Sequence, residues 1–189
     1  AREEAKVREK KEEIAREISE KLRLRLTGRE RQLLARRYTD STEAYEAYVK
    51  GKSHRYEERT KDMLLARDYF DQAIKKDPNF ALAFAGQAEN YMMLGLTSIL
   101  PRDEAATGAL RNATRALQLE PSLSEAHVSM GVTRMVFEWD WKGAEVDFRR
   151  ALALRPGNFD AYREYALLLT RTYRYDEAEN AFQQAQRID

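Results

Sequence analysis

The stretch from Ala144 to Pro156 reads AEVDFRRALALRP, and its spacing of small, aromatic and proline residues decides the fold class. Ala144, Phe148 and Ala151 lie four and three residues apart, and Pro156 follows five residues later. The same spacing recurs at Ala66, Phe70, Ala73 and Pro78, at Ala109, Ala113, Ala116 and Pro121, and at Ala178, Phe182 and Ala185. The first members of these sets are 43, 35 and 34 residues apart. A period near 34 residues predicts a repeated helix-turn-helix unit.

Helical geometry explains why these residue types recur. Steps of four and three residues place the side chains on one face of a helix. Alanine there lets a neighbouring helix approach closely, and phenylalanine fills the space between two helices. Proline cannot continue a helix interior, so each proline marks the turn into the next repeat. We expect Asn79, Ser122 and Asn158, which follow these turns, to cap the next helix.

Another helix is expected before each signature helix. Its packing residues are predicted to be Phe84, Ala88 and Tyr91 in the second repeat, and Tyr162, Ala166 and Leu169 in the fourth. The third repeat keeps a small residue, Gly131, at the central position. It has His127 and Arg134 at the two outer positions, so the aromatic residues expected there are missing. The predicted repeats span about 42–78, 80–121, 123–156 and 159–189 within an array over 39–189. A loop is predicted over Thr97–Thr107, and the first repeat is irregular, with two possible registers for its first helix.

These motifs resemble the tetratricopeptide repeat family over residues 42–189. The resemblance implies an all-α, right-handed solenoid of about four repeats that binds a protein or peptide and catalyses no reaction. A narrower resemblance rests on Ile18–Gly28, Arg37–Thr39, Tyr45–Gly51 and the sequence EWDW at 138–141. These stretches are similar to the C-terminal repeat arrays of bacterial multidomain regulators that carry a TolB-like domain. The chain would then be the interaction module of a larger signalling or transcription-regulating protein.

The composition excludes several classes of protein. Lys and Arg number 33 and Asp and Glu 32, so the net charge of +1 gives no general attraction to nucleic acid or to anionic membranes. The absence of cysteine excludes disulfides and thiolate metal sites. No stretch is apolar enough to span a membrane, and the first residues are not a signal peptide. We expect a soluble, cytoplasmic piece of a longer protein.

Residues 1–38 form a charged flank, predicted as a long helix over 1–26 and a short helix over 28–37. The long helix either lies in solvent and docks its last turns on the array, or contacts a second copy, and an engineered extension is a further alternative. The flank carries an arginine cluster at Arg23, Arg25, Arg29, Arg31, Arg36 and Arg37. These arginines either face water or bind an acidic partner or nucleic acid; we favour the first, because no aromatic platform accompanies them.

No catalytic, cofactor or metal site is predicted. Gly51-Lys52-Ser53 ends like a phosphate-binding loop, but Glu46 stands where that motif needs glycine. The only two histidines, His54 and His127, lack metal-ligand spacing. We expect Trp139 and Trp141 to clamp helices at a turn rather than to bind a ligand.

The family resemblance implies a partner-binding groove lined by the first helix of each repeat. Carried onto this sequence, the groove residues are Glu89, Met92 and Met93, then Val128, Val132 and Met135 with Val136 beside them, then Arg163, Leu167 and Thr170. The lysines and asparagines with which related repeats hold carboxylate tails are absent there. The apolar, methionine-rich lining suits an amphipathic helix. The alternative is that some of these side chains pack internally or under Thr97–Thr107.

Overall fold

The structure is a computed structural model that describes residues 38–55 and 60–188. The chain divides into two compact units, Ala1–Thr42 and Glu43–Asp189. The helix array belongs to the second unit. Both predicted helices of the flank, over 1–26 and 28–37, and the arginine cluster lie outside the described residues.

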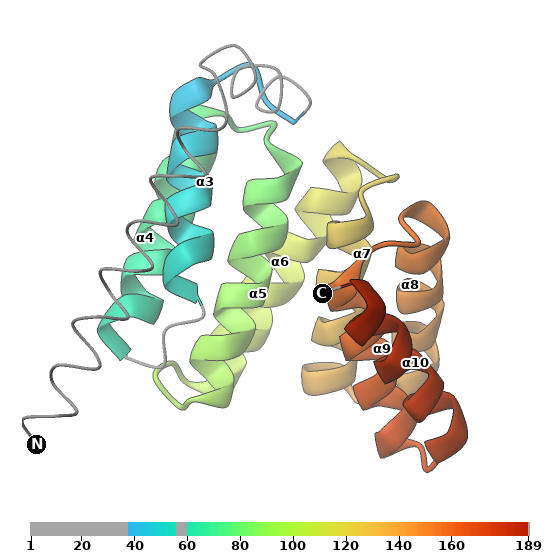
Figure 1. The fold of residues 1–189 in the computed structure, drawn as a ribbon. Helices are drawn as coiled ribbons and strands as arrows, with labels where there is room; N and C mark the ends of the chain where they lie inside the picture. Colours follow the sequence, from blue (N-terminus) through green and yellow to red (C-terminus); the bar gives the residue numbers. More distant parts are fainter. Residues whose placement is uncertain (1–37, 56–59, 189) are drawn as a thin grey trace, which may run out of the picture. The chain divides into compact units, whose positions relative to one another are not determined.

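Helices follow one another in antiparallel pairs along the array, and the described residues form no strand (Figure 1). They are α3 (Thr42–Arg55), α4 (Thr60–Lys76), α5 (Ala81–Leu96), α6 (Arg102–Leu119), α7 (Ser124–Thr133), the π-helix η1 (Arg134–Glu138), α8 (Trp141–Leu154), α9 (Phe159–Arg171) and α10 (Tyr175–Ile188). Each pair corresponds to one repeat of the sequence pattern. This arrangement confirms the predicted all-α solenoid of helix-turn-helix units.

The repeat signature forms the contacts between helices. Its alanines are buried at Ala66, Ala73, Ala109, Ala116, Ala144, Ala151, Ala178 and Ala185. Phe148 is fully buried, and a Cβ atom added to Gly131 would lie 2.7 Å from its ring. The first helix of the third repeat therefore needs glycine at 131 to approach α8. Phe70 is fully buried in the same way against Gly51 and Gly86.

Phe182 departs from the predicted packing role. Its side chain is 38% exposed, whereas Phe70 and Phe148 are fully buried. Phe70 is covered by α5 of the next repeat, and Phe148 lies beside Tyr165 of α9. In the described chain no further helix pair packs on α10, so Phe182 keeps the signature position without its cover.

Only one of the three predicted helix caps forms. The Asn158 side chain accepts a hydrogen bond from the backbone N–H of Ala161 at 3.1 Å. Helices α5 and α7 have Phe80 and Leu123 at the capping position, and neither makes a side-chain cap. Asn79 and Ser122 directly follow proline, one residue too early, whereas Gly157 separates Asn158 from Pro156. Asp77 and Glu120 instead accept from the backbone N–H groups of Asn79 and Ser122 and stabilise these turns.

The predicted loop over Thr97–Thr107 is only partly confirmed, because residues 97–101 connect α5 to α6 whereas residues 102–107 belong to α6. Helix α6 already begins at Arg102, directly after Pro101, and Asp103 and Glu104 occupy its first turn. Proline has the backbone angle that a helix start needs, and acidic residues in the first turn favour a helix N-terminus. The insertion therefore lengthens α6.

The lengthened α6 contacts the irregular part of the third repeat. Arg102 donates a hydrogen bond to the backbone oxygen of Val136 in η1 at 2.7 Å. Its guanidinium also lies 5.3 Å from the centre of the Phe137 ring. A π-helix disturbs the regular pairing of backbone groups, and Arg102 supplies a partner for one of them.

Candidate partner-binding groove

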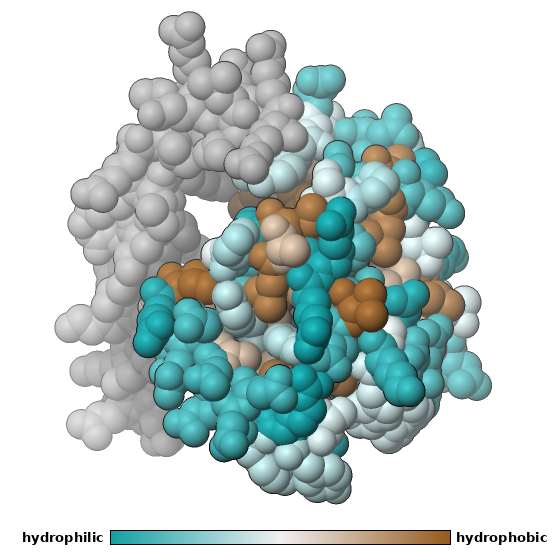
Figure 2. Space-filling model, turned by 90° about the vertical axis from the view of Figure 1, so that its right-hand side faces the viewer, coloured by the Kyte–Doolittle hydropathy of each residue, from teal (hydrophilic) through white to brown (hydrophobic). Residues whose placement is uncertain are grey.

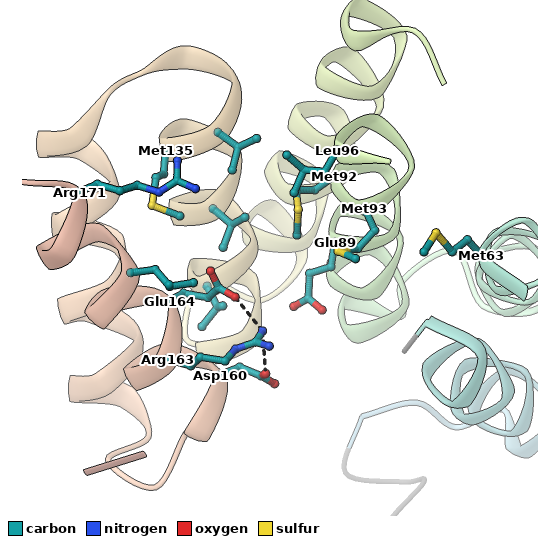
Figure 3. Close-up of a pocket in the computed structure, with 14 residues that line it drawn as sticks. Met63, Glu89, Met92, Met93, Leu96, Met135, Asp160, Arg163, Glu164 and Arg171 are labelled. Atoms are coloured by element: carbon teal, nitrogen blue, oxygen red, sulfur yellow. Dashed lines mark hydrogen bonds and ion pairs between the residues drawn. The ribbon is translucent and has the colours of Figure 1, made fainter. Parts of the chain in front are cut away.

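A groove of about 340 Å³ lies along the first helices of the second, third and fourth repeats. This volume is within the range of ordinary ligand pockets. We call it the methionine groove, and Figure 3 shows the residues that line it. They are Met63 of α4; Glu89, Met92, Met93 and Leu96 of α5; Val128 and Val132 of α7; Met135 and Val136 of η1; and Asp160, Arg163, Glu164, Leu167 and Arg171 of α9.

The floor of the groove belongs to the hydrophobic core. Val128, Val132, Met135 and Val136 are all buried and form one cluster with Phe148 and Leu168. Their packing below the groove agrees with the alternative that some predicted groove residues are internal. These side chains give the floor its apolar character but offer little surface to a partner.

The walls of the groove are more accessible than its floor. Leu96 on α5 is 55% exposed, and Leu167 on α9 is 38% exposed. Met92 and Met93 are partly buried beside Leu96. Contact with a partner would therefore fall on the walls.

Methionine is concentrated at this site. Of the five methionines in the chain, Met63, Met92, Met93 and Met135 line the groove, while Met130 packs in a different cluster with Ala88 and Ala113. The thioether side chain is flexible and polarisable, so it adapts to partners of different shape.

Among the charged residues of the groove, Arg163 and Glu89 have partners within the described residues and Arg171 has none. Arg163 binds Glu164 at 2.7 Å and Asp160 at 3.4 Å, and Glu89 accepts a hydrogen bond from Ser129 at 3.3 Å. Arg171 is exposed, and within the described residues its guanidinium has no hydrogen-bond or ion-pair partner. Figure 3 shows Arg171 on the side of Met135 and Leu96, away from Asp160 and Arg163.

The structure brings nearly all the predicted groove residues together, and Thr170 is the exception. Thr170 is exposed, donates a hydrogen bond to the backbone oxygen of Ala166 at 2.9 Å, and lines a shallow depression with Tyr175 and Phe182 instead. On a regular helix, residue 170 lies at the margin of the stripe that joins 160, 164, 167 and 171, and here it borders residues of α10.

Sequence reasoning missed Met63, Leu96, Asp160, Glu164 and Arg171. Helical periodicity could have found most of these residues. Leu96 lies four residues beyond Met92, and Arg171 four beyond Leu167. Met63 had no such signal, because it comes from the second helix of the irregular first repeat.

A partly buried polar cluster replaces the missing aromatic residues of the third repeat. Asp147 of α8 pairs with Arg134 and lies 3.2 Å from Nδ1 of His127. Nε2 of His127 lies 3.1 Å from the backbone oxygen of Pro121. His127 therefore has the structural role expected of it, through polar contacts rather than ring packing.

Two turns at the end of the first helix carry an aromatic residue in the left-handed conformation. Trp139 and Tyr173 have φ values of 59° and 62°, and each precedes a second aromatic residue, Trp141 or Tyr175, by two positions. Trp141 packs on the core, as expected, but Trp139 is 62% exposed and clamps no helices, so its predicted role is wrong.

The other sequence motifs do not form a site in the described part of the chain. Gly51-Lys52-Ser53 lies inside α3, and His54 stacks on Tyr69 and approaches Asp62. Among the described residues no group of acidic and histidine side chains could hold a metal ion, and no helix there is long and apolar enough to span a membrane.

The face over α8, α9 and α10 is mixed in character. Figure 2 shows its apolar residues as separate spots among hydrophilic ones.

No protein-family model matches the sequence, and no curated protein matches it. Several solved structures are similar to this chain. TTC0263, a thermophilic TPR protein of Thermus thermophilus, has 18% identity and a TM-score of 0.62 over 77% of this chain and 72% of that chain. The first TPR domain of Spaghetti (RPAP3), bound to the HSP90 peptide SRMEEVD, has 21% identity and a TM-score of 0.52 over 72% of this chain and 98% of that chain. MamA has 20% identity and a TM-score of 0.50 over 77% of this chain and 72% of that chain. At such identities the likeness concerns the fold, and the fold of this chain is that of tetratricopeptide-repeat proteins.

Proposed function

We propose that the chain is a non-catalytic protein- or peptide-binding module whose methionine groove receives an amphipathic helix. One observation carries this proposal: the accessible walls of the groove, at Met92, Met93, Leu96 and Leu167, are apolar. Removing apolar surface from water yields about 25 cal/mol per Å², so a partner that covers these walls gains free energy. A helix offers apolar residues at the spacing that such a groove accepts.

A carboxylate-rich peptide tail suits this groove poorly. Arg163 is already bound by Asp160 and Glu164, which leaves Arg171 as the one lining cation that none of the described residues pairs with. The structural neighbour RPAP3 binds a peptide that contains two glutamates, and its use of a TPR fold supports peptide binding in general rather than that ligand. The apolar walls favour a different peptide class here.

The parent protein is part of the same proposal. The lead-in at Ile18–Gly28 and the sequence EWDW at 138–141 support a regulatory module of a larger bacterial signalling or transcription-regulating protein in the cytoplasm. There, the groove would hold a helix of a partner or of another domain.

The experiment uses a fluorescent helical peptide of about 14 residues, or four turns, with leucine and phenylalanine on one face and uncharged residues elsewhere. Its binding is measured by anisotropy with the full chain and with the double variant Leu96→Glu/Leu167→Glu. Two charges on opposite walls should weaken binding by at least about tenfold. Both side chains are partly exposed, so the variant should fold.

The matched control is Val146→Glu/Leu110→Glu, which places the same charges at two exposed apolar residues outside the groove. It should bind like the wild type. Absence of binding to the wild type, or equal losses in both double variants, would contradict the proposed function.

A further inference from the structure

A second, shallow groove of about 610 Å³ lies along α6, the second helix of the second repeat. Helix α6 supplies nearly all of its lining residues, between Thr107 and Gln118, and Phe84 of α5 borders it. The methionine groove is lined mainly by first helices, and the two grooves have no described lining residue in common. They are therefore separate surfaces, and we call the second one the arginine groove.

The arginine groove carries two cations one helical turn apart. Arg111 and Arg115 lie at positions i and i+4 of α6, about 6 Å apart along the helix axis. Arg111 is exposed and Arg115 is half-buried, and none of the described residues forms a hydrogen bond or an ion pair with either guanidinium. Both groups therefore keep their N–H donors for a ligand.

The neighbouring carboxylates do not neutralise these arginines. No described residue that lines the groove carries a carboxylate, and Asp103 and Glu104 lie in the first turn of α6, outside the groove. Burial raises the pKa of the Asp71 carboxyl on α4, and the hydrogen bond from Gln87 and the charge of Arg111 oppose this shift. Asp71 binds Gln87 at 2.7 Å and forms no ion pair with Arg111. The groove therefore has an excess of positive charge.

We infer that the arginine groove binds an acidic segment of a protein partner, with two carboxylates one helical turn apart that face Arg111 and Arg115. A guanidinium can bind a carboxylate through two parallel hydrogen bonds, and such charged pairs are stronger than neutral hydrogen bonds. Thr107, Thr114 and Gln118 add neutral polar groups along about 16 Å of the same helix. An acidic segment, which suits the methionine groove poorly, thus has a separate site here.

A nucleic acid suits the arginine groove less well than an acidic peptide. Surfaces that bind nucleic acid neutralise many phosphates or stack bases on exposed aromatic rings. The described lining of the groove offers two cations, and its one aromatic ring, Phe84, is half-buried. A DNA duplex is therefore the competing occupant in the test.

The test measures, by fluorescence anisotropy, the binding of the full chain to two helical peptides. One has glutamates at positions i and i+4 among uncharged polar residues, and the other has glutamines at the same positions. Partly exposed ion pairs each contribute about two- to fivefold in affinity, so the glutamate peptide should bind about tenfold more tightly. This difference should shrink as salt is raised.

Arg111→Gln/Arg115→Gln should lower the affinity for the glutamate peptide to that for the glutamine peptide. Glutamine is a good helix former, so α6 should persist, which circular dichroism checks. The matched control is Arg150→Gln/Arg187→Gln, which removes the same charge at two exposed arginines of α8 and α10 outside both grooves. It should bind the glutamate peptide like the wild type.

Equal affinities of the wild type for the two peptides, or equal losses in the two double variants, would overturn this inference. So would a DNA duplex that binds through Arg111 and Arg115 while the glutamate peptide does not bind. None of these outcomes affects the proposed function, because its probe is uncharged and its double variant, Leu96→Glu/Leu167→Glu, lies in the methionine groove.

Discussion

The third and fourth helix pairs follow the same sequence pattern, but the contacts between their two helices differ. In the fourth pair, Ala166 and Leu169 of α9 form an apolar cluster with Ala178 and Ala181 of α10, and Tyr162 packs against it. The third pair has His127, Gly131 and Arg134 at the corresponding positions of α7, and Asp147 of α8 stands where α10 has Ala181. Both His127 and Arg134 contact Asp147.

The difference shows that a repeat tolerates a polar contact between its helices when the polar residues change together. The third pair is also the one whose first helix continues into η1, and that helix supplies the floor of the groove. The fourth pair has regular helices and supplies the wall that carries Leu167 and Arg171. Irregularity is therefore concentrated beside the candidate site.

The largest expected effect concerns the signature phenylalanines. Phe148→Ala should lower the free energy of unfolding by about 3–5 kcal/mol, because it empties a fully buried site. Phe182→Ala should cost only about 1 kcal/mol, because the Phe182 side chain is already 38% exposed. Urea unfolding measures both values. Equal losses would mean that the third and fourth pairs are covered alike and that the described packing of α10 is incorrect.

The next effect concerns the polar cluster of the third pair. Asp147→Ala should cost about 1–3 kcal/mol, because it leaves His127 and Arg134 without their buried acceptor. The triple variant His127→Tyr/Arg134→Leu/Asp147→Ala copies the residues of the fourth pair and should recover most of this loss. Thermal unfolding of the two variants gives the comparison. A triple variant less stable than Asp147→Ala would show that the two pairs do not share one packing geometry.

The smallest effect concerns Glu145, which joins the third pair to the fourth. It binds Arg174 at 2.9 Å and accepts a hydrogen bond from Tyr165 at 3.0 Å. Burial by itself would raise the pKa of Glu145, but the hydrogen bonds from Arg174 and Tyr165, with the charges of Arg174 and Arg149, hold it below its ordinary value. The ionised form is therefore favoured in the folded protein.

A lowered pKa means that this stabilisation is complete above the unfolded value of about 4.3 and is lost as the pH falls through the lower folded value. Glu145→Gln should cost about 0.5–1 kcal/mol at pH 7, and the difference from the wild type should shrink below about pH 4.3. Glu46→Gln, at an exposed residue of α3, is the control. A difference that is constant from pH 7 to pH 3 would contradict the role assigned to the ionised carboxylate.

Much of the groove could be predicted because its residues follow local periodicity. Leu167 lies between packing residues of its helix, and Met92 and Met93 directly follow the packing residue Tyr91, so their side of the helix is set by spacing alone. The same periodicity did not show that Val132 and Met135 would be buried while Leu96 and Leu167 stayed accessible. Burial depends on how closely neighbouring repeats approach, and that distance is not encoded within one helix.

The sequence by itself determined the helix pairs, their period and the face that the first helices of the second, third and fourth repeats turn to the groove, because these follow from the spacing of residues along single helices. Only the tertiary structure decided two other features: the contact of Arg102 with Val136, and the joining of His127 and Arg134 through Asp147. Each depends on residues from different helices or repeats meeting in space. Such contacts are set by the packing of whole helices rather than by the pattern of any one of them.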